Sequence, residues 1–517
     1  MILAQYSIRS KQDYIFKTNR VLEIVGASEN IARIWESLFE AADDASMKYR
    51  TADEEFSMAE AAGEFKKETL NFIELFCGGG NETILFDCDM DFQQDDSFRK
   101  LNRAFSYKLI EKYPGMIPMV AYVKATGDYS KDYKKLMDAS EIKRNIMEPQ
   151  WDMFTVPFAM MDRNIFQPYS TLVKINGQDI RMSDESSKKY TVGRKLRDSN
   201  EDIRLFDEMI TQKGKESLLA VVHADGNNMR AKIMEMLHDE ADYDKAVSLM
   251  RKFTRKTADC FETQGEAALK KCQSDLERMN EKSLKDKKLK KSSLAYRRVI
   301  GSGDDVTFVC NARFVMDYVK AYLDSVQNYS KNTGSEWDYS SCAGICIFHS
   351  HYPFSKAYSI AEQACDDGAK QKIHAVDDRG CVSVVEQSWM DFHFIQSGIG
   401  GDLSEIRRNQ GTKDCIARPW LVSHNGEAID DIPYRYECLL ALKDAVVKHE
   451  VSKARIKTVG SAYERSESAA KKELISLYGH TPGLEESVKK IFKDDQTFLK
   501  ALYDLAEIYD LWYTEVE

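Results

Sequence analysis

Two adjacent acidic residues, Asp304 and Asp305, lie between strand-forming residues in the stretch IGSGDDVTF. A third acidic residue, Asp225, directly follows the apolar run 218–224. Carboxylates brought close together repel one another, and a divalent cation relieves that repulsion. Mg²⁺ takes carboxylate and phosphate oxygens as ligands, and a pair of such ions aligns an in-line attack on phosphorus. These residues therefore predict metal-dependent chemistry on a phosphate-bearing substrate.

The residues around the three aspartates suit a phosphate ligand. Glycines at a turn let phosphates approach the backbone, and amides at a helix start favour anions. A lysine near the end of a later helix is a suitable contact for a triphosphate. We expect Gly226 to share the metal site with the aspartates. The expected nucleotide contacts are Gly226, Asn227, Asn228, Met229, Ser302, Gly303 and Lys370.

Each of these features also has an ordinary structural explanation. Gly-Asp-Asp is common in turns because Gly and Asp suit turn backbones. A lysine at a helix end is often a solvated side chain that interacts favourably with the helix dipole. The position of Asp225 at a strand end beside the predicted hairpin favours the metal-binding interpretation.

Hydrophobic periodicity places these residues in a regular order of elements. The apolar run 218–224 predicts a buried strand, and a helical region follows. Strands are expected at 296–300 and 306–311, joined as a hairpin, then a helix over 314–330 and a strand over 341–348. A further helix over 354–372 and a strand over 381–385 complete the pattern. The order βαββαβ with an extra strand predicts a ferredoxin-like palm domain.

The first third of the chain repeats this plan. Strands at 2–7 and 117–123 flank the hairpin 71–86, and GGGNETILF aligns with GSGDDVTFV. This alignment puts Asn81 on Asp304 and Glu82 on Asp305, and the strand that ends at Ser7 has no aspartate equivalent to Asp225. Such a tandem repeat predicts one working copy and one scaffold copy.

The remaining segments complete an α+β architecture of two tandem palm domains and a C-terminal helical domain. The segment 148–211 is polar and interrupted by prolines, which indicates a connector. Leu and Ala recur at helical spacing from residue 434 to the end. We expect a degenerate palm over 1–147, a connector over 148–211, a catalytic palm over 212–396 and a helical domain over 397–517.

Composition limits the classes of function. The 517-residue chain is 43% hydrophobic and carries a net charge of −11, so no global positive field draws it to nucleic acid. Its 11 cysteines include no CxxC pair, which indicates reduced thiols; neither a disulfide framework nor zinc is expected. The sequence contains no apolar run long enough to span a bilayer and no signal peptide. We expect a cytoplasmic protein without a membrane partner.

Several segments resemble one known family. HADGNNM, GSGDDVTF and SCAGICIFHSHYPFSKAYSIAEQACDDGAK, in this order, are similar to the second palm of the large polymerase-like subunit of type III CRISPR effector complexes. NRVLEIVGASENIARIW resembles a helix of that family's degenerate first palm, and ARPW at 417–420 resembles the start of its C-terminal helical domain. The resemblance covers most of the chain.

The resemblance implies a function in antiviral defence, the condensation of ATP into cyclic oligoadenylates. It implies that Asp225, Asp304 and Asp305 bind two Mg²⁺ or Mn²⁺ ions, with Asp225 bridging them. It also leaves open assembly with guide RNA, target RNA and other type III subunits, and the formation of a homo-oligomer.

The sequence departs from the family pattern in three ways. Ser302 replaces a glycine, which costs about 1 kcal/mol if that position has a positive φ. Asn227 replaces an aspartate, so the site is less acidic. The first strand begins at residue 2 and the inter-palm cysteines are missing, so we expect the form without an HD nuclease domain, with neither DNA cleavage nor zinc.

Three functions remain in competition. The first is a nucleotidyltransferase that makes cyclic or linear oligoadenylates. The second is a nucleotide-binding scaffold subunit of an RNA-guided complex with little or no turnover. The third is a diguanylate-cyclase-like enzyme that uses GTP, which the Asp-Asp pair disfavours because that family has Asp-Glu.

Overall fold

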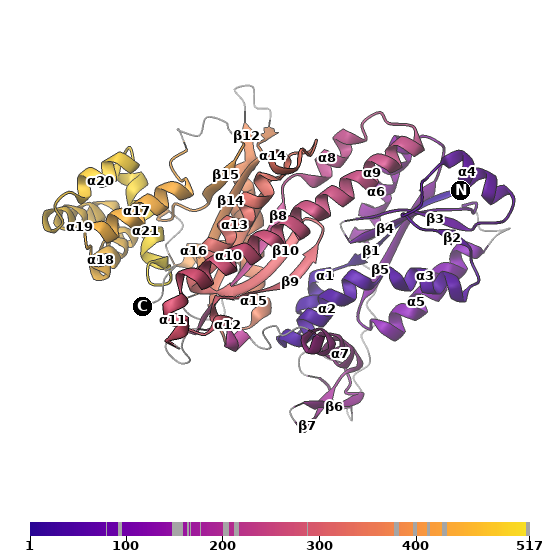
Figure 1. Cartoon of the computed structure of the whole chain (residues 1–517), viewed down its shortest axis with the longest axis horizontal. Helices are drawn as coiled ribbons and strands as arrows, with labels where there is room; N and C mark the ends of the chain where they lie inside the picture. Colours follow the sequence, from indigo (N-terminus) through magenta and orange to yellow (C-terminus); the bar gives the residue numbers. More distant parts are fainter. Residues whose placement is uncertain are drawn as a thin grey trace. The chain divides into compact units, whose positions relative to one another are not determined.

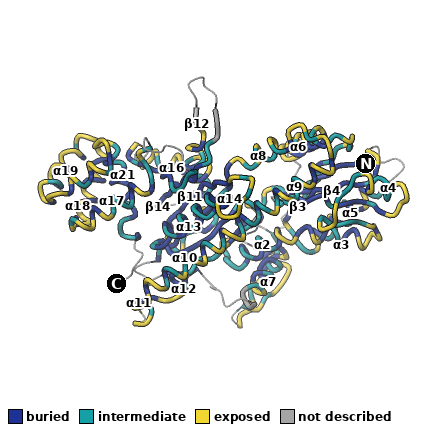
Figure 2. Tube along the Cα trace, turned by 45° about the horizontal axis from the view of Figure 1, so that its top comes forward, coloured by how far each residue is buried: buried dark blue, intermediate teal, exposed yellow. Residues whose placement is uncertain are grey.

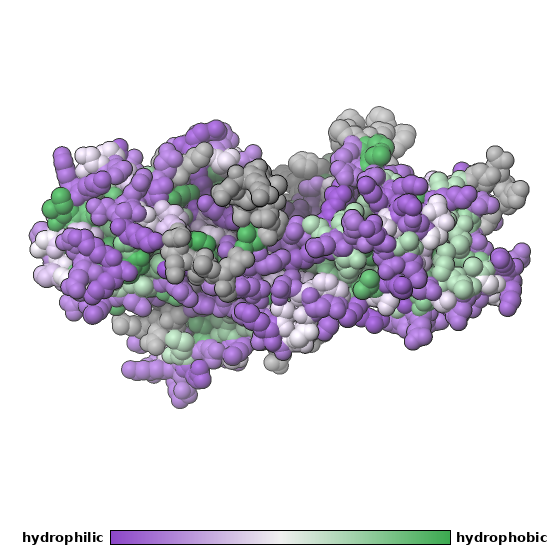
Figure 3. Space-filling view, turned by 90° about the horizontal axis from the view of Figure 1, so that it is seen from above, coloured by the Kyte–Doolittle hydropathy of each residue, from purple (hydrophilic) through white to green (hydrophobic). Residues whose placement is uncertain are grey.

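A computed structural model of the chain contains sheets covered by helices (Figure 1). No helix of the described residues is long and apolar enough to cross a membrane. Hydrophilic side chains dominate the surface seen in Figure 3. The structure describes residues 1–78, 80–90, 96–146, 159–162, 165, 167–175, 177–199, 206–210, 217–286, 288–376, 382–395, 401–410, 414–425 and 432–512.

The chain forms two compact units. The first comprises Met1–Arg204, Asn228–Asp259 and Val299–Asp304, and the second comprises the remaining segments. The helices within residues 228–259, which come soon after the first strand of the second palm, therefore belong to the unit of the first palm.

The first palm has a five-stranded sheet with the order β2-β3-β4-β1-β5. Strand β1 lies between β4 and β5 and is antiparallel to both. The helices α3 and α5 contact each other beside this sheet (Figure 1). The bounds are β1 (Ile2–Arg9), β2 (Tyr49–Arg50), β3 (Phe72–Gly78), β4 (Asn81–Phe86), β5 (Ile117–Lys124), α1 (Lys11–Phe16), α2 (Val21–Arg33), α3 (Glu36–Asp44), α4 (Met58–Lys66), α5 (Ser97–Lys112) and α6 (Tyr129–Asn145).

Helix α9 (Tyr243–Ala258) packs on the first palm. Its buried residues Tyr243, Ala246, Val247 and Met250 recur at helical spacing and join a core cluster that includes residues of β1, β3, β4 and α6. The Tyr243 hydroxyl also donates a hydrogen bond of 2.7 Å to Asp132. Burial of this apolar face explains why α9 belongs to the first unit.

The segment predicted as a connector contains regular structure where it is described. It forms the hairpin β6 (Thr171–Ile175) and β7 (Gln178–Met182), followed by α7 (Asp184–Ser199). Helices α2 and α7 pack closely at Gly26 and Gly193, because a Cβ on either glycine would lie 1.9 Å from a carbonyl oxygen of the opposite helix. Within the predicted connector, residues 148–158, 163, 164, 166, 176, 200–205 and 211 lie outside the described residues.

The second palm has a six-stranded sheet with the order β15-β14-β11-β8-β10-β9. The four strands β11-β8-β10-β9 reproduce the order of β5-β1-β4-β3 in the first palm, so the predicted tandem repeat of ferredoxin-like sheets is confirmed. Buried residues run along its central strands (Figure 2). The bounds are β8 (Leu218–Gly226), β9 (Tyr296–Ser302), β10 (Asp305–Asn311), β11 (Ser341–His349), β14 (Gln387–Phe394) and β15 (Trp420–His424).

Different helices cover the two faces of this sheet. Tyr322 of α13 (Val315–Gln327) lies against Phe308 of β10, with 6.5 Å between ring centroids. On the opposite face, a Cβ on Gly344 of β11 would lie 1.9 Å from the carbonyl oxygen of Ala361 and 2.4 Å from the amide nitrogen of Cys365. The missing side chain at Gly344 therefore lets the segment 354–373 lie directly on the sheet.

The covering segment differs from the single helix predicted over 354–372. It consists of α15 (Phe354–Gln363), a π-helical turn η4 (Ala364–Gly368) and a 3₁₀ segment η5 (Ala369–Ile373). A π-helical turn and a 3₁₀ turn change the direction of the side chains that follow them. The end of this segment therefore presents its residues differently from a regular helix.

A strand forms within the range predicted, 381–385, but it does not belong to the main sheet. Residues Val382–Val384 form β13, which pairs with β12 (His374–Val376) in a separate two-stranded sheet. The strand that extends the main sheet is β14, which is parallel to β11. Residue 381 lies outside the described residues.

The C-terminal region is helical, as predicted, but it begins with α16 and a strand of the palm sheet, β15. Arg418, just before β15, forms ion pairs with Asp504 and Glu507 of the last helix, α21. The helical bounds are α16 (Leu403–Asn409), α17 (Tyr436–Lys448), α18 (Lys453–Arg465), α19 (Glu467–His480), α20 (Leu484–Ile491) and α21 (Asp495–Ile508).

Candidate functional site

Asp225 and Asp305 lie on neighbouring central strands. In the antiparallel pair β8 and β10, His223 is opposite Thr307 and Ala224 is opposite Val306. By continuation of this register Asp305 lies across from Asp225, and residues directly opposite have Cβ atoms about 5 Å apart on one face. Their side chains are partly exposed, 27% for Asp225 and 33% for Asp305. The structure thus brings together two of the three predicted carboxylates.

Lys370 of η5 binds Asp225. Its ammonium contacts Oδ2 of Asp225 and lies 3.3 Å from Oδ1 of Asp366. Burial alone would lower the pKa of Lys370, but the attraction of Asp225 outweighs burial and raises the pKa. Lys370 was predicted to contact a triphosphate, and here it neutralises a predicted metal ligand instead. The phosphate role stays a prediction.

His223 lies behind the two aspartates on the same face of the sheet. Its Nδ1 is 3.4 Å from Oδ1 of Asp305, 3.5 Å from the Thr307 hydroxyl and 3.4 Å from the Tyr358 hydroxyl. Burial lowers the pKa of His223, although Asp225 acts in the opposite direction. The ring is therefore neutral near pH 7. Sequence reasoning did not single out His223 because it sits inside an apolar run.

Asp304 occupies the turn between β9 and β10. The positive φ of this turn, 66°, belongs to Gly303, whereas Ser302 is the last residue of β9. The replacement of glycine by serine therefore falls outside the strained position, and the expected cost does not arise. Asp304 belongs to the first compact unit, and Asp225 and Asp305 belong to the second. Convergence of all three carboxylates stays a prediction.

The residues after Asp225 form a strand end and a helix start, as predicted. Gly226 ends β8, and α8 (Met229–Met236) begins after Asn228, which has a left-handed φ of 59°. The Asn227 amide nitrogen Nδ2 donates to the Ser340 hydroxyl at 2.8 Å and to the carbonyl of Gln387 at 3.0 Å. Asn227 therefore ties the end of β8 to its neighbours, and a nucleotide contact from this residue stays a prediction.

The equivalent place in the first palm is filled by an aromatic cluster. Tyr6 of β1 lies opposite Glu82, just as Asp225 lies across from Asp305. Its ring packs edge-on against Phe105 at 5.8 Å and Trp35 at 6.5 Å. Burial raises the pKa of Glu82 well above its usual range. The first copy thus has hydrophobic packing where the second has paired carboxylates.

The donor atoms of the second palm fit a hard divalent cation. Carboxylate oxygens are the ligands that Mg²⁺ prefers, and Asp225 and Asp305 face the same side of adjacent strands. The ammonium of Lys370 lies against Asp225, so a positive charge is favourable beside this carboxylate. The residues present are consistent with a metal site at the end of β8.

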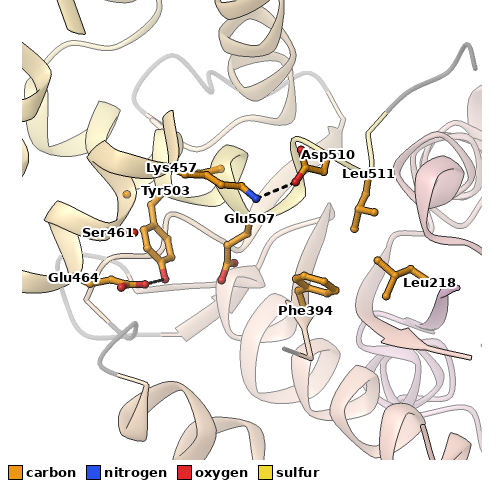
Figure 4. Close-up of a pocket in the computed structure, with 11 residues that line it drawn as sticks. Leu218, Phe394, Lys457, Ser461, Glu464, Tyr503, Glu507, Asp510 and Leu511 are labelled. Atoms are coloured by element: carbon orange, nitrogen blue, oxygen red, sulfur yellow. Dashed lines mark hydrogen bonds and ion pairs between the residues drawn. The ribbon is translucent and has the colours of Figure 1, made fainter. Parts of the chain in front are cut away.

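A pocket of about 360 Å³ lies at the other end of β8 (Figure 4). Leu218 and Phe394 from the sheet face Tyr503 and the Lys457–Asp510 ion pair from the C-terminal helices. At about 3.3 Å per strand residue, Leu218 and Asp225 are roughly 23 Å apart. This pocket is therefore separate from the aspartates.

The match to a protein family concerns the segment that carries the aspartates. Residues 218–376 match the family model of the Cas10/Cmr2 second palm domain. This segment is similar to a Cas10/Cmr2 second palm domain. The resemblance noted in the sequence is confirmed for it, and the matched residues include the strands β8 to β11 with their hairpin. No curated protein matches the chain.

Solved structures of type III CRISPR subunits resemble the whole chain weakly. A type III-B Cmr-beta structure in the apo state has 9% identity and a TM-score of 0.48, covering 99% of this chain and 82% of that chain. A Csm1–Csm4 cassette in complex with cA4 has 11% identity and a TM-score of 0.45, covering 98% and 69%. Csm1 of T. onnurineus has 11% identity and a TM-score of 0.45, also covering 98% and 69%.

Proposed function

We propose that the chain is a metal-dependent nucleotidyltransferase that condenses ATP into cyclic or linear oligoadenylates. The observation that carries the proposal is the placement of Asp225 and Asp305 across from each other within a Cas10/Cmr2 second palm domain. The first palm supports it by contrast, because Tyr6 takes the place of Asp225 there. One copy of the repeat kept its carboxylates, and the other packs aromatic rings.

Asp225, Asp304 and Asp305 are the residues that would hold two Mg²⁺ or Mn²⁺ ions. When bound, such ions favour ionisation of an attacking 3′-hydroxyl and stabilise a departing pyrophosphate. Before nucleotide arrives, Lys370 keeps Asp225 oriented and lowers the repulsion between the carboxylates. When a triphosphate binds, Lys370 exchanges Asp225 for a phosphate oxygen.

His223 orients Asp305 in this proposal. Its buried ring borders one oxygen of that carboxylate, while Thr307 and Tyr358 hold the ring in place. The other oxygen of Asp305, Oδ2, is then left to bind a metal ion, since the Asp305 side chain is partly exposed. A fixed carboxylate loses less freedom when it takes a ligand, which favours binding.

We further propose that the chain works with other subunits of a type III CRISPR complex, including guide RNA and target RNA. The similar structures include Csm1 in a cassette with Csm4 and a chain of a Cmr-beta complex. Because the net charge of this chain is negative, RNA would bind through local contacts and not through attraction to the whole molecule.

The test is a turnover assay on the full chain. Labelled ATP or GTP is incubated with Mn²⁺ or Mg²⁺, with and without co-purified RNA, and products are resolved by chromatography. Parent protein should form oligoadenylate from ATP, and Asp305→Asn should abolish it. Asp275→Asn on α10 (Gly265–Met279), which changes a partly exposed carboxylate, is the matched control and should keep activity.

Two observations favour the scaffold function. Lys370 neutralises Asp225, and Asn227 leaves the site less acidic than its family pattern. A scaffold would bind ATP but yield no product in any condition, RNA included. Product from GTP alone would instead support a diguanylate-cyclase-like enzyme.

A further inference from the structure

Three potential metal ligands meet beneath Lys370, on the face of the second palm covered by α15 and η4. They are His223 of β8 and Cys365 and Asp366 of η4. One donor atom from each lies within 4.8 Å of the other two. His223 and Cys365 are buried, and Asp366 is exposed. The cluster therefore has a closed interior and one side that is open to solvent.

We propose that His223, Cys365 and Asp366 form a binding site for Zn²⁺, separate from the carboxylate site for Mg²⁺ or Mn²⁺. An imidazole nitrogen, a thiolate and a carboxylate are the ligand types that Zn²⁺ takes in proteins. Three protein ligands leave the fourth tetrahedral position to water. Mg²⁺ prefers oxygen ligands, so the two sites are selective for different ions.

The dimensions of the cluster are close to those required. Zn²⁺ bonds of about 2.0 to 2.3 Å put tetrahedral ligand atoms roughly 3.5 Å apart. Side-chain rotations that move the donor atoms by about 1 Å would therefore bring all three within bonding distance of an ion. The Cys365 thiol now donates to the Cys342 carbonyl at 3.3 Å. On binding, its proton passes to solvent and the thiolate sulfur bonds to the ion.

The surroundings of His223 match the outer shell of a zinc ligand. A metal-bound histidine commonly uses its second ring nitrogen to contact a carboxylate or another oxygen, which fixes the ring. Here Nδ1 lies 3.4 Å from Asp305 and 3.5 Å from Thr307, so Nε2 is the nitrogen that we assign to Zn²⁺. In this arrangement Asp305 touches both sites, as a metal ligand in one and as a partner of His223 in the other.

The backbone also brings Cys365 to this place for a specific reason. Gly344 lies opposite His223 in the pairing of β11 with β8, and its missing side chain lets the amide of Cys365 approach the sheet. The π-helical turn η4 then puts Cys365 and Asp366 beside the same imidazole. Single π-helical turns are frequent at functional sites.

Zinc binding would change the contacts of Lys370. Asp366 now lies 3.3 Å from the ammonium of Lys370, which also contacts Asp225. An ion that takes the Asp366 carboxylate removes one of the two acidic partners of Lys370. Binding of Zn²⁺ itself does not depend on the proposed nucleotidyl transfer.

The test uses Co²⁺ as a spectroscopic substitute for Zn²⁺ on the full chain. After chelator treatment and dialysis, Co²⁺ is titrated and the thiolate-to-cobalt charge-transfer band is recorded, followed by competition with Zn²⁺. We expect a thiolate band that saturates at one Co²⁺ per chain and is lost on addition of Zn²⁺. Cys365→Ser should remove the band, and Asp366→Asn should weaken binding by at least the roughly 10- to 100-fold typical of an outer-shell loss.

Two controls keep the result interpretable. Cys346→Ser changes a buried thiol of β11 that is not a proposed ligand, so it should leave the band unchanged. Asp225→Asn should also keep it, although that change should abolish ATP condensation. Because Asp366 is exposed, its variant tests the site even if Cys365→Ser fails to fold. No thiolate band at saturating Co²⁺, or an unchanged band in Cys365→Ser, would overturn the site whatever the outcome with ATP.

Discussion

Replacing Lys370 by methionine should strengthen metal binding and weaken ATP binding at the same time. The Lys370 ammonium lies against Asp225, so a metal ion that binds this carboxylate must displace it. Two unit charges about 4 Å apart attract by about 4 kcal/mol at an effective dielectric constant of 20. Partial exposure of both side chains and the cost of ordering them reduce this, and about 1–2 kcal/mol is a reasonable net value.

That energy corresponds to about a 5- to 30-fold change in affinity. A titration of Mn²⁺ followed by electron paramagnetic resonance, in the absence of nucleotide, should show tighter binding to Lys370→Met by this factor. The same variant should bind ATP more weakly, because it lacks the cation that would contact the triphosphate. Lys372→Met, an exposed lysine of the same η5 segment, is the matched control and should change neither affinity.

Two outcomes would refute this reasoning. If Mn²⁺ affinity is unchanged in Lys370→Met but lost in Asp225→Asn, the ammonium does not compete for the carboxylate. If Mn²⁺ affinity and ATP affinity both fall, Lys370 positions Asp225 without moving to the nucleotide. Thermal unfolding of the variant should be measured in parallel, because loss of an ion pair also affects stability.

Two further predictions concern the sheet that holds the site. Gly344→Ala should destabilise the chain by about 1–3 kcal/mol, because its Cβ would collide with the backbone of α15 and η4, whereas Gly479→Ala meets no neighbour; equal unfolding free energies would contradict this. Burial, with Arg418 and Arg407 nearby, lowers the pKa of His393 from 6.5 to about 3. As the pH falls, His393 is protonated in the unfolded chain before it is protonated in the folded chain. The neutral ring therefore costs no stability above pH 6.5, and the free energy of unfolding drops by about 2 kcal/mol at pH 5. His393→Gln should lose less stability than its parent between pH 7 and pH 5 in urea unfolding, and an identical loss would be the contrary result.

Local patterns were sufficient to predict the core of the site. The continuous apolar run of β8 indicated a buried central strand, and Gly303 next to Asp304 indicated the tight turn of the hairpin. Their order along the chain placed Asp225 and Asp305 on adjacent strands, and the register confirms this placement. These features depend on residues close in sequence or on a known topology, which makes them accessible without coordinates.

The contacts between distant segments could not be predicted. Lys370 reaches Asp225 from 145 residues away, and it does so because η4 and η5 replace the regular helix expected there. The pairing of His223 with Cys365 has the same origin. Neither arrangement leaves a spacing signal in the sequence, since each depends on how the covering segment meets the sheet at Gly344.

Strand β14 was missed, and the packing of helix α9 on the first palm was not foreseen, for other reasons. In β14 charged and aromatic residues, including a buried Asp391, replace the simple alternation that marks a strand. Asp391 is tolerated there because Arg407 binds both of its oxygens. Helix α9 was expected in the second palm, but its apolar face packs on the first palm. Hydrophobic periodicity predicts an apolar face and does not show which domain that face will contact.

The most direct measurement is anomalous diffraction from crystals of the chain soaked with Mn²⁺ and a non-hydrolysable ATP analogue. We predict manganese peaks within bonding distance of Asp225 and Asp305, with Asp304 completing the site and the Lys370 ammonium moved from Asp225 to a phosphate. Peaks at other positions, with Lys370 still bound to Asp225, would contradict a metal site built from these carboxylates.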